Sequence, residues 1–192
     1  MNMGSKKAET KRTLKENILD WIVTIAMGVA LYFAIDFCIG RVRVDGISMD
    51  TTFHEGQLLM VNKLNYRFNE PKRGDVVVFT SPVEPDKEYI KRLIGLPGDK
   101  ISIQDSVLYL NGQAVDEPYL HEAMTYDFPE MTVPEGMYFA MGDNRNHSFD
   151  SRSWGGVPRK NLIGNAFFRY WPLTRLGVIG NDVPLAMDSD GE

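Results

Sequence analysis

One serine in this chain stands in a loop where nucleophilic chemistry is feasible. Ser48 lies in "VDGISMDTTF" (residues 44–53), two residues after a glycine. A serine hydroxyl is too weakly acidic to act as a nucleophile unaided, so it needs a neighbouring base. Histidine is the usual base, and His54 and His147 both qualify by residue type. However, "GISMD" is not the G-x-S-x-G nucleophile pattern, so this stretch leaves the base open.

A lysine is the alternative base, and Lys91 is the candidate. It stands in "EYIKRLIGLPGD" (residues 88–99), where its neighbours are largely apolar. A free lysine has a pKa of about 10.4, and burial can lower that pKa by roughly 3 units or more. A strand lysine more commonly points to solvent, so the spacing alone does not identify a Ser–Lys pair.

Composition limits the other chemistries. The chain has 192 residues and a net charge of -5, and no basic stripe is interleaved with aromatic residues. These features disfavour nucleic-acid binding. Cys38 is the only cysteine, which excludes an intrachain disulfide and a zinc site of paired cysteines. The three histidines lack metal-ligand spacing. We therefore expect no metal and no cofactor.

An apolar run near the N-terminus predicts a membrane anchor. Residues 21–35, "WIVTIAMGVALYFAI", carry no charge, and with their flanks they reach the roughly 20 residues that a spanning helix needs. A basic cluster precedes the run, which places the N-terminus in the cytoplasm and everything after Gly40 outside. The cluster consists of Lys6, Lys7, Lys11, Arg12 and Lys15.

A buried helix and a cleavable signal peptide are the competing interpretations of this run. The basic cluster argues against a buried helix. A signal peptide would end in an A-x-A-like site, which the exit "DFCIGRVR" lacks, and the span is long for a signal sequence. We expect a retained single span in the plasma membrane.

The remainder of the chain has the pattern of a β domain. Short apolar or alternating runs are separated by turn residues, and Asn111-Gly112 is a strong hairpin signal. Residues 113–134 contain three prolines and predict a long irregular excursion, and no stretch after residue 40 has a helical period. The predicted strands are 57–63, 75–79, 88–94, 99–103, 106–111, 136–141 and 165–171.

These patterns predict a mainly β protein in which an N-terminal transmembrane helix precedes a β-rich domain. Four segments follow: a cytoplasmic basic segment (1–17), a transmembrane anchor (18–39), an extracytoplasmic β domain (40–180), which the resemblance described next implies is catalytic, and an acidic tail (181–192). The tail has no assigned role.

Four stretches resemble the type I signal peptidases, or leader peptidases, in order and in local sequence. The resemblance extends from about residue 15 to 172 and is closest to the single-span form common in Gram-positive bacteria. The stretches are "GISMDTTF" (46–53), "RGDVVVF" (73–79), "KRLIGLPGD" (91–99) and "GDNRNHSFDSRSWGGVP" (142–158).

The resemblance implies a role for each matching residue. Ser48 matches the family nucleophile, Lys91 its general base, and Ser148 the serine that orients that lysine. It further implies a β-rich body with a small apolar groove, which removes signal peptides from exported preproteins after small residues at positions -1 and -3. Two ion pairs beside the site are also implied, Arg92 with Asp143 and Asp150 with Arg152.

Two positions depart from the family pattern. Thr51 replaces the proline of S-M-x-P-T, and because proline fixes φ we expect Thr51 to loosen the turn behind Ser48. Gly46 stands where some members have a serine that contributes to the oxyanion hole. With glycine there, the oxyanion would rely on backbone N–H groups, chiefly that of Ser48.

The sequence therefore predicts a membrane-anchored serine endopeptidase that uses a Ser–Lys dyad. Its expected partners are preprotein substrates and the lipid bilayer, with no nucleic acid. The alternative is a catalytically impaired, membrane-tethered module that binds exported chains. Self-cleaving repressors with a Ser–Lys dyad are disfavoured by the anchor. Ile47, Met49 and Phe53 fit either a bilayer contact or the core.

Overall fold

The computed structural model describes residues 14–180, which form two units: a helical unit up to Phe37 and a body from Cys38 onward. Each unit is described by itself. The predicted acidic tail and most of the predicted basic segment lie outside the described residues.

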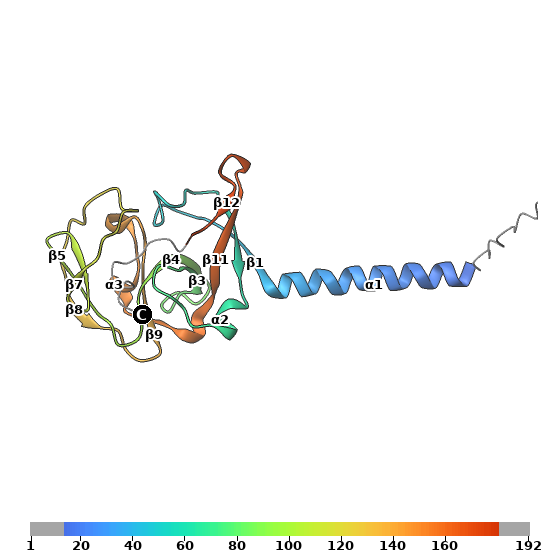
Figure 1. The fold of residues 1–192 in the computed structure, drawn as a ribbon, viewed down its shortest axis with the longest axis horizontal. Helices are drawn as coiled ribbons and strands as arrows, with labels where there is room; N and C mark the ends of the chain where they lie inside the picture. The colour runs from blue at the N-terminus through green and yellow to red at the C-terminus, as the bar shows by residue number, and fades with distance from the viewer. Residues whose placement is uncertain (1–13, 181–192) are drawn as a thin grey trace, which may run out of the picture. The chain divides into compact units, whose positions relative to one another are not determined.

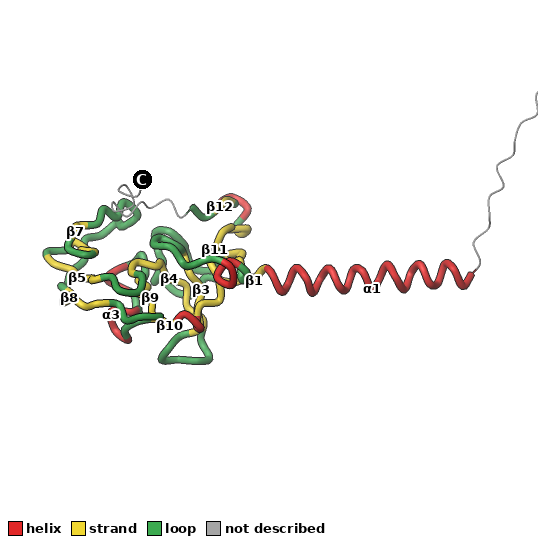
Figure 2. The backbone as a smooth tube through the Cα atoms, turned by 60° about the horizontal axis from the view of Figure 1, so that its bottom comes forward, coloured by secondary structure: helices red, strands yellow, loops and turns green. Residues whose placement is uncertain are grey.

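The helical unit is a single apolar helix, α1 (Leu14–Cys38), drawn without a break in Figure 2. Its stretch Asn17–Cys38 is long and apolar enough to cross a membrane. Large apolar side chains are exposed at nearly consecutive positions, among them Trp21, Met27 and Phe33. A helix that is apolar on all sides suits a lipid environment better than an aqueous one.

The body contains a larger antiparallel sheet with the strand order β1-β2-β11-β3-β4-β9-β10, and β12 pairs with β11. Figure 1 shows β3, β4 and β11 side by side in the body. The strands are β1 (Ile39–Arg43), β2 (Leu58–Asn62), β3 (Val76–Thr80), β4 (Glu88–Gly95), β9 (Met137–Met141), β10 (Val157–Pro158), β11 (Leu162–Trp171) and β12 (Gly177–Val178).

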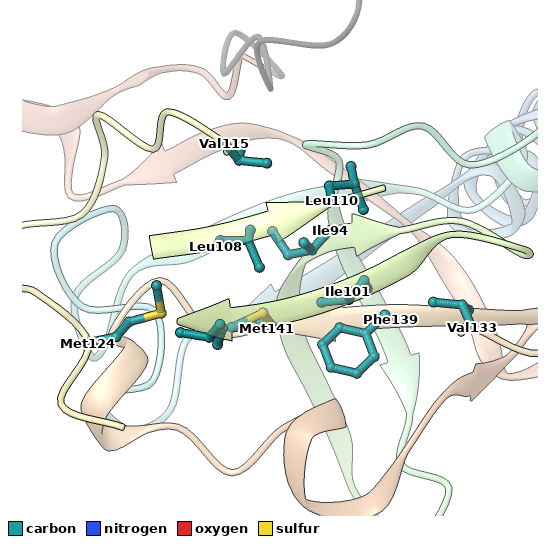
Figure 3. Packing of buried hydrophobic residues seen from close by; sticks show 10 residues of the cluster. Ile94, Ile101, Leu108, Leu110, Val115, Met124, Val133, Phe139 and Met141 are labelled. Atoms are coloured by element: carbon teal, nitrogen blue, oxygen red, sulfur yellow. The ribbon is translucent and has the colours of Figure 1, made fainter. Parts of the chain in front are cut away.

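A smaller four-stranded sheet has the order β7-β6-β5-β8. Its strands are β5 (Lys100–Gln104), β6 (Val107–Leu110), β7 (Gln113–Ala114) and β8 (Phe128–Thr132). An apolar cluster joins this sheet to β4 and β9, and Figure 3 shows Ile101 and Leu110 facing Ile94 and Phe139 across it. This packing fixes the C-terminal half of β4, the strand that carries Lys91.

The predicted mainly β fold with an N-terminal apolar helix is confirmed. All seven predicted strands are present, as β2, β3, β4, β5, β6, β9 and β11. The predicted hairpin is also present: Asn111 and Gly112 both have positive φ, and Leu110 pairs with Gln113. Positive φ at both central residues is the geometry that an Asn-Gly turn favours.

The excursion predicted over 113–134 is wrong in part, because it contains β7 and β8. Strand β8 reads "FPEMT" and therefore lacks an apolar alternation. Its Pro129 is tolerated because β8 lies at the edge of its sheet, where β5 is its one neighbour among residues 14–180. Two short α-helices in the body also escaped prediction, α2 (Asn65–Phe68) and α3 (Ser151–Trp154). Four residues are too few to show a helical period.

Candidate active site

The structure brings Ser48 and Lys91 into direct contact. Lys91 Nζ donates a hydrogen bond to Ser48 Oγ at 2.6 Å, although the two residues are 43 positions apart in the sequence. The two candidate histidines make other contacts: His54 Nδ1 pairs with Asp50 Oδ1 at 2.5 Å, and His147 Nδ1 contacts Asn144 Oδ1 at 3.3 Å. Of the bases that the sequence left open, the lysine is the one beside the serine.

Strand β4 keeps Lys91 out of water. The strand is paired with β3 on one side and β9 on the other, with Val77 directly opposite Lys91, and Lys91 is only 3% exposed. Its side chain therefore does not point to solvent. Burial is the main cause that lowers the pKa of Lys91 from its usual value to about 8. The Asp150 and Asp143 charges raise this pKa, and the Arg152 charge lowers it.

The loop that carries Ser48 is anchored by two buried apolar side chains. Met49 and Phe53 are each 1% exposed and pack with Leu59 and Val76 in one core cluster, and the Phe53 N–H donates to Met49 O at 2.8 Å. Ile47, in contrast, is about half exposed. Met49 and Phe53 thus belong to the core rather than to a surface that could contact a bilayer.

A second segment lies against the back of Ser48. The Asn144 backbone N–H donates to Ser48 O at 3.0 Å. Gly142 permits this approach, because a Cβ there would lie 2.4 Å from Ser48 O and 2.3 Å from Ser148 Oγ. Any larger residue at 142 would push the two segments apart.

Ser148, the predicted orienting serine, lies in this second segment but is not hydrogen-bonded to Lys91 in the structure. Its Oγ is buried and has no hydrogen bond of normal geometry among the described residues. The hydroxyl is nonetheless close enough to the Asp150 carboxylate to help lower the pKa of that group. The orienting role of Ser148 therefore stays a prediction.

Both predicted ion pairs form. Arg92 binds Asp143 through two nitrogens, at 2.8 and 2.7 Å, with side chains 3% and 0% exposed. Arg152 binds Asp150 in the same way, at 2.7 and 2.5 Å. The Gly142 N–H also donates to Asp150 at 3.0 Å. Burial nevertheless raises the pKa of Asp150 above its usual value.

A third buried ion pair was missed from the sequence. Arg145 Nη2 lies 2.5 Å from Glu117 Oε1, with side chains 2% and 4% exposed. Between this pair and the Arg92 pair lies Tyr119, whose ring is 4.3 Å from the Arg92 guanidinium carbon and whose hydroxyl accepts from Arg145 at 2.9 Å. Arg145 lies within the "GDNRNHS" stretch, which was the one available signal. Glu117 and Tyr119 lie in the predicted excursion, where no sequence signal pointed to them.

A small cavity opens onto the two central residues. It has a volume of about 70 Å³ and is lined by both Ser48 and Lys91. Val42, Val44 and Ile90 supply apolar walls. A space of this size, beside a serine hydroxyl, admits a small side chain better than a large one.

Comparison with known proteins identifies the family of this chain. The family model for signal peptidase, peptidase S26, matches residues 18–171. The chain belongs to this signal peptidase family. It is 41% identical to signal peptidase I of Bacillus licheniformis, over 88% of this chain and 97% of that protein.

Two further relatives carry related names. Signal peptidase IB of Staphylococcus aureus is 35% identical over 84% of this chain and 93% of that protein. A crystal structure of a signal peptidase I from Enterococcus faecalis is 39% identical, covers 50% of this chain and 97% of that chain, and has a TM-score of 0.47. Membership of this family supports a serine-type peptidase.

Thr51 adopts a backbone conformation that the expectation of a loosened turn did not foresee. Its φ is 92°, a value rare for a β-branched residue. Three polar contacts hold the turn: the Thr51 N–H donates to Asp50 Oδ1 at 3.0 Å, its hydroxyl donates to Tyr119 O at 3.2 Å, and Asp50 pairs with His54. The turn is therefore strained and tied rather than loose.

We predict that restoring the family proline at this position destabilises the protein. Thr51→Pro would require a φ near -65° and would remove the N–H that Asp50 accepts, so the free energy of unfolding should fall by about 1–3 kcal/mol. Thr51→Gly should instead raise it by up to about 1 kcal/mol. Thermal unfolding of the full chain in detergent measures both. A Thr51→Pro protein as stable as the parent would contradict the positive φ.

We also predict that replacing Lys91 by methionine stabilises the body at neutral pH. The folded-state pKa is depressed, so the lysine is protonated and buried at a cost below about pH 8, and this cost is relieved as the pH rises toward 10.5. Lys91→Met should raise the free energy of unfolding by roughly 1–3 kcal/mol at pH 7, and by less at pH 10. Lys100→Met, at a lysine whose side chain is 58% exposed, is the control. A less stable Lys91→Met protein at pH 7 would refute this.

Proposed function

We propose that this chain is a membrane-anchored serine endopeptidase that removes signal peptides from exported preproteins through a Ser48–Lys91 dyad. The observation that carries the proposal is the 2.6 Å contact between Lys91 Nζ and Ser48 Oγ at a small, partly apolar cavity. A depressed lysine pKa supports it, because a general base must be neutral to accept a proton.

In the acylation step, neutral Lys91 accepts the Ser48 proton while Ser48 Oγ attacks the scissile carbonyl carbon. The negative charge that develops on the carbonyl oxygen is stabilised by backbone N–H groups, chiefly that of Ser48, because Gly46 supplies no hydroxyl. The Lys91 ammonium then donates its proton to the leaving amine as the peptide bond breaks. The mature protein departs and the signal peptide remains as an ester on Ser48.

In the deacylation step, Lys91 is neutral again and takes a proton from water. The resulting hydroxide attacks the ester carbonyl, and the protonated lysine returns the proton to Ser48 Oγ as the ester bond breaks. The small cavity beside Ser48 is the proposed binding site for the residue at -1, and its volume of about 70 Å³ favours a side chain as small as alanine.

The apolar helix completes the proposal. We propose that residues 18–39 anchor the chain in the plasma membrane, with residues 1–17 in the cytoplasm and the β domain of residues 40–180 outside. A preprotein presents its cleavage site at the outer surface of the same bilayer. Anchoring the enzyme there raises the effective concentration of site and substrate without any new contact.

The first test compares the parent chain with Ser48→Ala and Lys91→Ala in detergent, using a preprotein whose signal ends in A-x-A. We expect cleavage at that junction by the parent alone, with each variant reduced by at least about a thousandfold, because nucleophile and base act as a unit. His54→Gln and His147→Gln are the matched controls and should retain cleavage. Loss of cleavage in either histidine variant would refute the dyad. Absence of cleavage by the folded parent chain would also refute it, and would favour a binding module instead.

The second test is the pH dependence of cleavage. Because the neutral form of Lys91 is the base, kcat/KM should rise with pH and reach half its maximum near pH 8, the pKa of the buried lysine. His54→Gln should leave this midpoint unchanged. A midpoint near pH 6.5, the pKa of an ordinary histidine, would assign the base to a histidine instead.

A further inference from the structure

A basic cleft lies in the body and is separate from the cavity at Ser48. It has a volume of about 520 Å³, and every charged residue that lines it is a cation. The chain as a whole carries a net charge of -5, so this concentration of positive charge runs against the overall composition. The four cations are Lys63, Arg67, Arg159 and Lys160.

The cleft lies where the chain enters the body from α1. Cys38 is the last residue of that helix, and its carbonyl accepts a hydrogen bond from the Lys63 N–H at 3.0 Å. The Lys63 side chain also lies close to Gly40, because a Cβ at residue 40 would be 3.0 Å from Lys63 Cε. If α1 spans the bilayer, chain continuity places these residues at the membrane surface.

Protein contacts hold Arg159 in the cleft. Arg159 Nη2 donates to the carbonyl oxygens of Tyr66 and Asn69 at 2.8 and 3.2 Å. Its Nε lies 3.5 Å from Glu70, whose side chain is 81% exposed. The nearby acid Asp75 is buried and accepts from the Tyr66 hydroxyl at 2.9 Å. Neither of these two acids lines the cleft.

An exposed aromatic residue stands beside the cations. Phe68 follows Arg67 on the short helix α2, and its side chain is 80% exposed. A single exposed apolar residue needs no explanation in a water-soluble protein. An aromatic ring beside cations at the exit of a membrane helix, however, is the combination that binds the boundary between headgroups and acyl chains.

We propose that this cleft binds the phosphate group of an anionic phospholipid headgroup where the anchor leaves the bilayer. The inference rests on the membrane anchoring in the proposed function, and it adds a second attachment of the body to the membrane. Cations near an anionic leaflet attract its phosphates, and one such residue contributes about a fivefold gain in affinity. With both attachments, the body keeps one orientation toward the bilayer.

Hydrogen–deuterium exchange of the full chain in lipid nanodiscs tests this inference. Residues 63–69 and 159–163 should exchange more slowly in discs that contain phosphatidylglycerol than in discs of phosphatidylcholine alone. Lys160→Gln should raise the phosphatidylglycerol fraction needed for half-maximal protection about fivefold. The double variant Arg67→Glu/Lys160→Glu should abolish the protection.

The matched control is Lys87→Glu/Lys100→Glu, which makes the same charge change at two exposed lysines away from the cleft. It should retain the lipid-dependent protection. Equal protection in both disc types, or equal loss in both double variants, would overturn the proposal. Protection by inorganic phosphate in phosphatidylcholine discs, without a phosphatidylglycerol effect, would overturn the lipid as the ligand.

Two parallel measurements separate this proposal from the proposed function. Cleavage of the preprotein in detergent should be unchanged in the cleft variants, because none of the cleft residues lines the cavity at Ser48. Resistance of the parent chain to alkaline extraction from membranes tests the anchor. Loss of the anchor or of cleavage therefore refutes the proposed function, whereas loss of lipid-dependent protection alone refutes the cleft.

Discussion

The contact between Lys91 Nζ and Ser48 Oγ depends on keeping a lysine out of water. A lysine reaches this state only when well-packed structure surrounds it, because the charged form loses its hydration on burial. Strand β4 supplies that structure: β3 and β9 pair with it, and the apolar cluster beneath its C-terminal half fixes its position. The large sheet and its core therefore bury Lys91, and this burial lowers its pKa.

The buried ion pairs meet a second requirement. Acids near a lysine favour its charged form and raise its pKa, so their effect on Lys91 has to be limited. Asp143 and Asp150 both raise the pKa of Lys91. Each carboxylate is bound through two nitrogens of an arginine, and the Arg152 charge itself acts to lower the lysine pKa. The two arginines therefore hold the acids in place, and Arg152 also offsets their effect on the pKa of Lys91. Replacing such an acid removes a structural partner and also changes the electrostatics around Lys91.

The sequence predicted the strands because their apolar runs are bounded by turn residues, and it predicted Ser48, Lys91 and two ion pairs through local motifs. It could not pair β8 with β5, because "FPEMT" has no alternation of its own. It also missed the Glu117–Arg145 pair, which joins residues 28 apart and obeys no local spacing. The conformation of Thr51 could not be predicted for the same reason, because its hydroxyl donates a hydrogen bond to Tyr119, which lies far along the chain.

The path along the chain from α1 to Ser48 is short. Strand β1 begins directly after α1, and its Ile39 end pairs with Asn62, beside the basic cleft. Its Arg43 end leads into the loop that carries Ser48. Five residues of strand extend over roughly 17 Å. If the proposed anchor and cleft hold the Ile39 end at the headgroups, Ser48 lies within a few tens of ångströms of the bilayer surface. A substrate whose signal helix is still embedded in the membrane can then present its cleavage site to Ser48.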